Sequence, residues 1–245
     1  MVLGGQIFFD AYDRKARLAP ALLAIAPLFG ALALRADEWA FLGTLASIAV
    51  GLGGLWLLTD MARTMGKSKE AKLFRIWGGK PSVQLMRHAD GEVDGFSKLR
   101  YHQFLAIKSG IAMPTAIEEA ADPKQADARY ESALRWLLES TRDKAKFSLL
   151  ASENITYGFR RNGYGIRHVG LFICAATLIW GIAGAPSMEL TAVLMHASQP
   201  KVAIHIGICV VMAFVWLAFF RAATVRDAAF TYANELLRSC EQLAG

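Results

Sequence analysis

Residues 77 to 88 read WGGKPSVQLMRH, and their glycine pair, lysine and serine suggest the chemistry of phosphate binding. A P-loop requires GxxxxGK followed by Ser or Thr, with backbone amides wrapped around the phosphates. Here Lys80 is followed by Pro81, and Phe74 stands where the first glycine is needed. Pro81 also lacks the amide hydrogen that would serve as a donor. The segment is therefore not a P-loop, and we expect a turn at the glycine pair followed by a helix that begins near Pro81.

This turn could still bind an anion, because the first amides of a helix attract negative charge. Side chains that could complete such a site are the basic and aromatic residues nearby, namely Trp77, Lys80, Arg87, His88 and Arg100. The alternative is an interfacial turn anchored by Trp77, since tryptophan is enriched where a membrane meets water.

A second candidate site lies in residues 153 to 165, which read ENITYGFRRNGYG. Paired arginines, asparagines and aromatic rings among flexible glycines supply the charge, amide edges and stacking faces that phosphate or base recognition needs. The candidate ligand contacts are Asn154, Tyr157, Arg160, Arg161 and Asn162. The same composition would suit an aromatic elbow at the point where the chain enters a membrane helix.

The composition indicates that the chain carrying these candidate residues is a membrane protein. The chain is 54% hydrophobic, with a mean hydropathy of +0.31, which is too apolar for an ordinary soluble domain. At 1.5 Å per residue, four apolar stretches form helices of roughly 25–30 Å, the thickness of a bilayer core. We predict these spans at Leu18–Leu34, Trp39–Leu58, Val169–Pro186 and Val202–Phe220. His205 is the ionisable residue within them, and it is either a pore residue or a neighbour of the outer headgroups.

The basic residues predict how the chain crosses the bilayer. Lys and Arg are concentrated before the first span, after the second, before the third and after the fourth. The positive-inside rule therefore places both termini and the long middle segment in the cytoplasm of a bacterium, with the spans in its inner membrane. The middle segment, 60–168, holds 19 Lys and Arg against 13 Asp and Glu, an excess equal to the net charge of the whole chain. This charge either contacts anionic lipid headgroups or converges on a phosphate-bearing ligand.

The predicted fold is all-α, with two membrane hairpins and a helical cytoplasmic domain between spans two and three. Thr115 and Glu118 have the spacing of a helix capping box, and residues 126 to 138 carry an apolar stripe at helical spacing. The predicted segments are a cytoplasmic N-terminus (1–17), hairpin 1 (18–58), the basic helical domain (60–168), hairpin 2 (169–220) and an amphipathic helix (221–245). The apolar face of that last helix forms either an oligomer seam or a contact with the chain's own helices.

Signals of an enzyme or a metal site are missing from the sequence. No GxSxG, HExxH, paired-carboxylate or Cys/His pattern occurs in the segment predicted to be cytoplasmic. Three cysteines and five histidines share no ligand spacing, so we predict no metal, no cofactor and no enzymatic activity.

The chain resembles a group of bacterial membrane proteins that share a WGGxP-like segment, here Trp77 to His88, and an ENxxYGFRRN segment, here Glu153 to Asn162. Its architecture is similar to the membrane effectors of anti-phage defence operons, of the Hailong type. The resemblance implies an oligomeric ion channel, controlled by the nucleic-acid or nucleotide product of a partner nucleotidyltransferase.

The leading hypothesis is thus an oligomeric, channel-like effector in anti-phage defence, gated by an oligonucleotide or nucleotide bound to its basic cytoplasmic domain. Its expected partners are membrane lipid, further copies of the chain, that ligand and a soluble protein encoded in the same operon. One alternative is a non-conducting membrane scaffold that recruits a soluble partner, and a further alternative is a small transporter.

Overall fold

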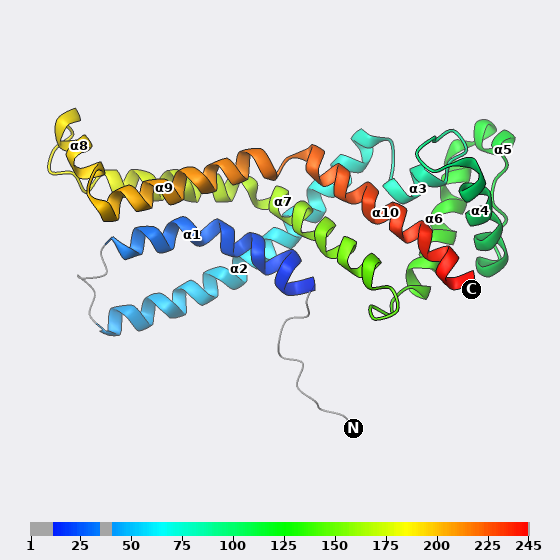
Figure 1. Cartoon of the computed structure of the whole chain (residues 1–245), viewed down its shortest axis with the longest axis horizontal. Coiled ribbons are helices and arrows are strands. Elements are labelled where there is room, and N and C mark those ends of the chain that lie inside the picture. The colour runs from blue at the N-terminus through cyan, green and yellow to red at the C-terminus, as the bar shows by residue number, and fades with distance from the viewer. Residues whose placement is uncertain (1–11, 35–40, 245) are drawn as a thin grey trace, which may run out of the picture. The chain divides into compact units, whose positions relative to one another are not determined.

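The computed structural model describes residues 12–34 and 41–244, with side chains described from residue 53 onward in the second range. Every element in this part of the chain is helical, which confirms the all-α prediction (Figure 1). The helices are η1 (Asp13–Leu18), α1 (Ala19–Ala33), α2 (Phe41–Trp77), α3 (Pro81–Met86), α4 (Gly95–Ser109), α5 (Ala116–Ala121), α6 (Pro123–Ser140), α7 (Ser148–Ile182), α8 (Leu190–Ala197), α9 (Pro200–Phe214), η3 (Val215–Phe219) and α10 (Ala222–Ala244). The two η elements are π-helical turns.

Three helical stretches are long and apolar enough to cross a bilayer, which indicates a membrane protein. They are Asp13–Ala33, Ser148–Ile182 and Pro200–Phe219, and they contain most of the predicted first, third and fourth spans. The predicted second span, Trp39–Leu58, begins outside the described residues, and the side chains of its first half are not described either. The count of four spans therefore stays a prediction.

The chain divides into two compact units. Unit 1 contains the described residues up to Glu70 together with Gly158–Val225, and unit 2 contains Ala71–Tyr157 with the described residues from Arg226 onward. Unit 2 is thus shorter at both ends than the predicted domain 60–168, and it gains most of α10.

Glycines of α7 bring the helices of unit 1 into close contact. A methyl group built on Gly165 would lie 2.5 Å from the amide nitrogen of Gly66 in α2. A methyl group on Gly163 would collide with the ring of Phe220, and one on Gly170 with the ring of Trp216. The glycines of residues 153 to 165, which we expected to be flexible, instead lie inside one helix and allow its neighbours to approach.

Unit 2 has its own apolar core. The predicted stripe of α6 is buried there at Tyr130 and Leu137, together with Leu105 of α4. The capping box predicted for Thr115 and Glu118 is confirmed at the start of α5. The apolar face of α10 joins the same core through Ala233, Leu236, Leu237 and Cys240. Within one copy, the chain's own helices therefore cover this face.

Candidate functional site

The WGGKPSVQLMRH segment forms the predicted turn and helix start in unit 2. Gly78 and Gly79 have φ angles of 87° and 136°, a region that side chains with a Cβ rarely enter. Helix α3 then begins at Pro81, as expected. Trp77 lies beside Phe74 and Phe230, with ring centroids 5.9 and 6.5 Å away, so its indole belongs to an aromatic cluster of this unit.

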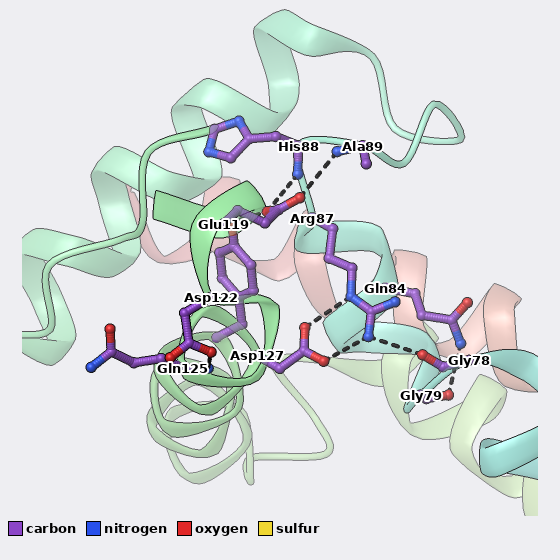
Figure 2. Close-up of polar contacts among 11 residues, drawn as sticks. Gly78, Gly79, Gln84, Arg87, His88, Ala89, Glu119, Asp122, Gln125 and Asp127 are labelled. Carbon is purple, nitrogen blue, oxygen red and sulfur yellow. Dashed lines mark hydrogen bonds and ion pairs between the residues drawn. The ribbon is translucent and has the colours of Figure 1, made fainter. Parts of the chain in front are cut away.

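The predicted ligand-binding arginine of this turn is engaged by a carboxylate. Arg87 donates from Nε and Nη2 to the two carboxylate oxygens of Asp127, at 2.8 and 2.6 Å, and from Nη2 to the carbonyl of Gly78 at 2.9 Å (Figure 2). The hydrogen bond with Asp127 raises the pKa of the Arg87 guanidinium above its ordinary value. Arg87 therefore joins the glycine turn to α6 (Figure 2).

Two further predicted basic residues also meet carboxylates. Lys80 Nζ lies 2.5 Å from Glu131 Oε1, and Arg100 Nη2 lies 2.8 Å from Glu241 Oε1. Unit 2 as a whole carries 15 Lys and Arg against 14 Asp and Glu, so it is close to neutral. The positive excess of the chain is found mainly in unit 1.

Glu119 is the centre of a buried polar network that the sequence did not indicate. Its carboxylate accepts the backbone amides of His88 and Ala89, at 2.9 and 3.2 Å (Figure 2). It also accepts the hydroxyl of Tyr130, at 2.7 Å. Burial alone would raise the pKa of Glu119, but these three hydrogen bonds to the charged form outweigh it and lower the pKa. In the sequence, the available signal was a second glutamate directly after the capping Glu118.

Lys98 closes the loop beside this network. Its Nζ donates to the carbonyls of Arg87 and Asp90, at 2.6 and 2.5 Å, and its side chain is buried. Burial lowers the pKa of the Lys98 ammonium. His102 lies next to it, with Nε2 bonded to the carbonyl of Met86 at 2.8 Å. The segment after α3 is therefore held by side chains from α4, α5 and α6.

A pocket of about 570 Å³ opens over this network. Its polar lining is Arg87, His88, Glu119 and Asp127, and its apolar lining comes from alanines and Pro123. His88 Nε2 lies 2.9 Å from the carbonyl of Pro114, so this nitrogen is the donor. Two carboxylates against one guanidinium make the pocket suited to a ligand with hydrogen-bond donors and an apolar face, and poorly suited to a phosphate.

The second predicted site is divided between the units. Asn154 and Tyr157 belong to unit 2, where the ring of Tyr157 stacks on that of Tyr232 with centroids 6.1 Å apart. Arg160, Arg161 and Asn162 belong to unit 1.

In unit 1, two of these side chains are buried within the packing of the helices. Arg161 Nη1 lies 2.9 Å from Glu70 Oε1, and Arg161 Nε donates to Asn162 Oδ1 at 3.2 Å. The Asn162 amide donates to the carbonyl of Ala16 at 2.8 Å. Arg161 and Asn162 thus join η1, α2 and α7. Arg160 differs, because its guanidinium carbon lies 4.1 Å from the centroid of the Phe219 ring and its side chain is half-buried.

His205 is buried among the helices of unit 1. Its Nε2 lies 2.9 Å from the carbonyl of Thr177, and methyl groups built on Gly30 and Gly181 would lie within 3 Å of its ring. Cys209 Sγ is 3.6 Å from Nε2. Within one copy of the chain His205 therefore packs between α1, α7 and α9, and its role in a pore stays a prediction. No three His, Cys, Asp or Glu side chains among the described residues are grouped so that they could hold a metal ion.

Comparison with known proteins finds no family model that matches the chain, and no similar curated protein or solved structure.

Proposed function

We propose that the chain is a multi-pass protein of the bacterial inner membrane that assembles into an oligomeric, channel-like effector. A phosphate-rich ligand, an oligonucleotide or nucleotide, would bind at the basic end of unit 1. The observation that carries this proposal is the position of the charge relative to the contacts between the helices.

Three close contacts between the helices of unit 1 lie within one turn of α7. Ala16 meets Asn162, Gly66 meets Gly165, and Phe220 meets Gly163. Gly158 also meets Ala16, which brings the number of contacting positions to seven. Within three residues of these positions along the sequence, the chain carries ten Lys and Arg side chains. We call them the basic belt: Arg14, Lys15, Arg17, Arg63, Lys67, Lys69, Arg160, Arg161, Arg167 and Arg221. Along the sequence, the acidic residues nearest to this belt are Asp13, Asp60 and Glu70.

The belt offers a physical route from ligand to membrane helix. Nine of its ten charges lie on η1, α2 and α7, which continue into apolar stretches of sequence, so a polyanion bound here acts on the ends of those helices. Like charges in neighbouring copies repel, and neutralising them shifts the assembly toward a different packing. The proposed orientation follows from the same charges, since the positive-inside rule puts the belt at the cytoplasmic surface.

Ion flux into liposomes tests the channel. Purified full-length chain should conduct, and a single-stranded oligonucleotide should change the flux. The variant Arg63→Glu with Lys67→Glu should lose the response, because both side chains are exposed. Lys108→Glu with Lys124→Glu, the same change of charge at two exposed positions of unit 2, is the control. Absence of flux with and without oligonucleotide would rule out the channel.

One observation favours a second function, a scaffold that recruits a soluble partner. Helix α4 exposes Phe96, Leu99 and Ile107 along one face, by 82%, 55% and 79%. A row of large apolar side chains at helical spacing is typical of a protein-binding surface. Recovery of a stable partner whose binding is lost in Phe96→Ser with Ile107→Ser, from a chain that does not conduct, would support the scaffold instead.

A further inference from the structure

An apolar pocket of about 390 Å³ lies within unit 1, at the level of the basic belt. It is lined by Leu23 of α1, Phe159 of α7 and five apolar side chains between Phe214 and Phe220. Its volume falls in the range of about 300–1,000 Å³ that small-molecule sites occupy. The absence of any polar residue from this lining means that a bound molecule must present hydrocarbon to it.

The π-helical turn η3 shapes this pocket. A π-helix places an extra residue in one turn, so the side chains after Phe214 leave the usual helical register. The backbone then bends at Phe220, with φ −91° and ψ 72°. The rings of Phe219 and Phe220 therefore stand together, with centroids 6.1 and 5.4 Å from that of Phe159. Phe220 is buried, and Phe219 is partly open to the surroundings.

Two arginines stand beside this hydrocarbon pocket. The guanidinium of Arg160 lies over the exposed Phe219 ring, and Arg221 directly follows Phe220 and is exposed. Neither side chain forms an ion pair with a carboxylate in the part of the chain that the structure describes. Their charge is thus available to an anion next to the pocket, unlike that of Arg161, which Glu70 neutralises.

We infer that this pocket is a phospholipid site, which takes one acyl chain of an anionic lipid and holds its headgroup phosphate between Arg160 and Arg221. The hydrocarbon lining selects a lipid over free phosphate or a nucleotide, neither of which carries an acyl chain. The arginines select an anionic lipid over a zwitterionic one, because each basic residue near a membrane surface favours anionic headgroups. The site does not depend on whether the chain conducts ions.

Native mass spectrometry of the full-length, delipidated chain in detergent measures the site. Phosphatidylglycerol and phosphatidylcholine with identical acyl chains are the probes, and the first should form the stronger adduct. Arg160→Gln with Arg221→Gln should weaken phosphatidylglycerol binding by about 30-fold, the effect of two basic residues at a membrane surface. Arg63→Gln with Lys67→Gln, which removes the same charge from α2, should keep the preference.

A second pair of variants tests the acyl chain. Ala218→Trp fills the pocket and should remove the strong phosphatidylglycerol adduct, while Ala203→Trp, on an exposed position of α9, should keep it. Glycerophosphoglycerol, the headgroup without acyl chains, should fail to displace the lipid from the unaltered chain. Displacement by this headgroup would show an anion site without a lipid pocket. Equal binding of both lipids, or unchanged binding in Arg160→Gln with Arg221→Gln, would overturn the inference even if the tryptophan variants did not fold.

Discussion

Arg87 and Asp127 form a two-pronged ion pair that connects a glycine turn to a helix 40 residues further along the chain. A planar guanidinium that meets both oxygens of a carboxylate combines charge with fixed geometry. Arg87 also bonds the Gly78 carbonyl, so this single side chain holds a turn whose backbone angles favour glycine. The arginine that looked like a ligand contact in the sequence has a clear structural task in unit 2.

Arg87→Gln should loosen this turn. We expect a local loss of about 1–2 kcal/mol, because the partners are partly exposed and water screens some of their attraction. Hydrogen exchange of peptides covering residues 76–90, measured on the full chain, should become about 5–30-fold faster, the rate change that this loss implies. The control is Arg142→Gln, whose pair with Glu139 is exposed at the surface. Equal exchange in the two variants would contradict the assignment.

Glu119→Gln should destabilise unit 2 more than Tyr130→Phe. A glutamine has one acceptor oxygen and no charge, so at least one of the partly buried His88 and Ala89 amides loses its partner, at a cost of about 1–3 kcal/mol. Tyr130→Phe removes a donor and leaves the two amide bonds to Glu119 in place. Thermal unfolding of the full chain, followed by circular dichroism, should give the lower Tm for Glu119→Gln, and the reverse order would refute the network.

Acid should weaken unit 2 through the same carboxylate. The folded pKa of Glu119 lies below its ordinary value of 4.5, so its stabilisation is complete above that value. It is lost as the pH falls through the lower, folded pKa. Unfolding curves recorded between about pH 3 and 6 should therefore show a Tm that falls as the pH is lowered. This fall in Tm should be smaller in Glu119→Gln than in the parental chain. An identical acid limb in both proteins would exclude this origin.

Protonation of His102 should weaken unit 2 separately, at a pH closer to neutral. Burial lowers its pKa below the ordinary 6.5, and the hydrogen bond to the Met86 carbonyl opposes this incompletely. His88 and Lys98 lower the pKa further, while Glu119 raises it. The unfolded chain therefore binds a proton first, and unit 2 loses stability as the pH falls from 6.5 toward the folded pKa. His102→Gln should remove this limb of the Tm curve while leaving the one below pH 4.5, and a limb that persists would identify another group.

Features set by neighbouring residues could be predicted from the sequence. Pro81 as a helix start and Thr115 with Glu118 as a capping box depend on spacings of a few residues, and both are present. The apolar stripe of α6 follows helical periodicity in the same way.

The partners of the basic residues could not be predicted, because they come from distant parts of the chain. Lys80 meets a glutamate 51 residues away and Arg100 meets one 141 residues away. Without these pairs, the excess of positive charge in residues 60–168 looked like a property of the folded helical domain.

The role of the glycines of α7 differs from the prediction for another reason. Gly158, Gly163 and Gly165 suggested flexibility, although small residues within a helix also allow close helix packing.

Gly165 gives the most direct test of that packing. A methyl group there would meet the backbone of Gly66, which has no side chain that could move aside. Gly165→Ala should therefore separate α2 from α7 and cost about 1–3 kcal/mol, the usual effect of overpacking. Gly207→Ala in α9 is the matched control, since its new methyl group would have no atom within 4 Å among the described residues. Thermal unfolding in detergent should show a lower Tm for Gly165→Ala and an unchanged or higher Tm for Gly207→Ala, because alanine favours a helix over glycine. If both variants keep the parental Tm, α2 and α7 do not pack through these glycines.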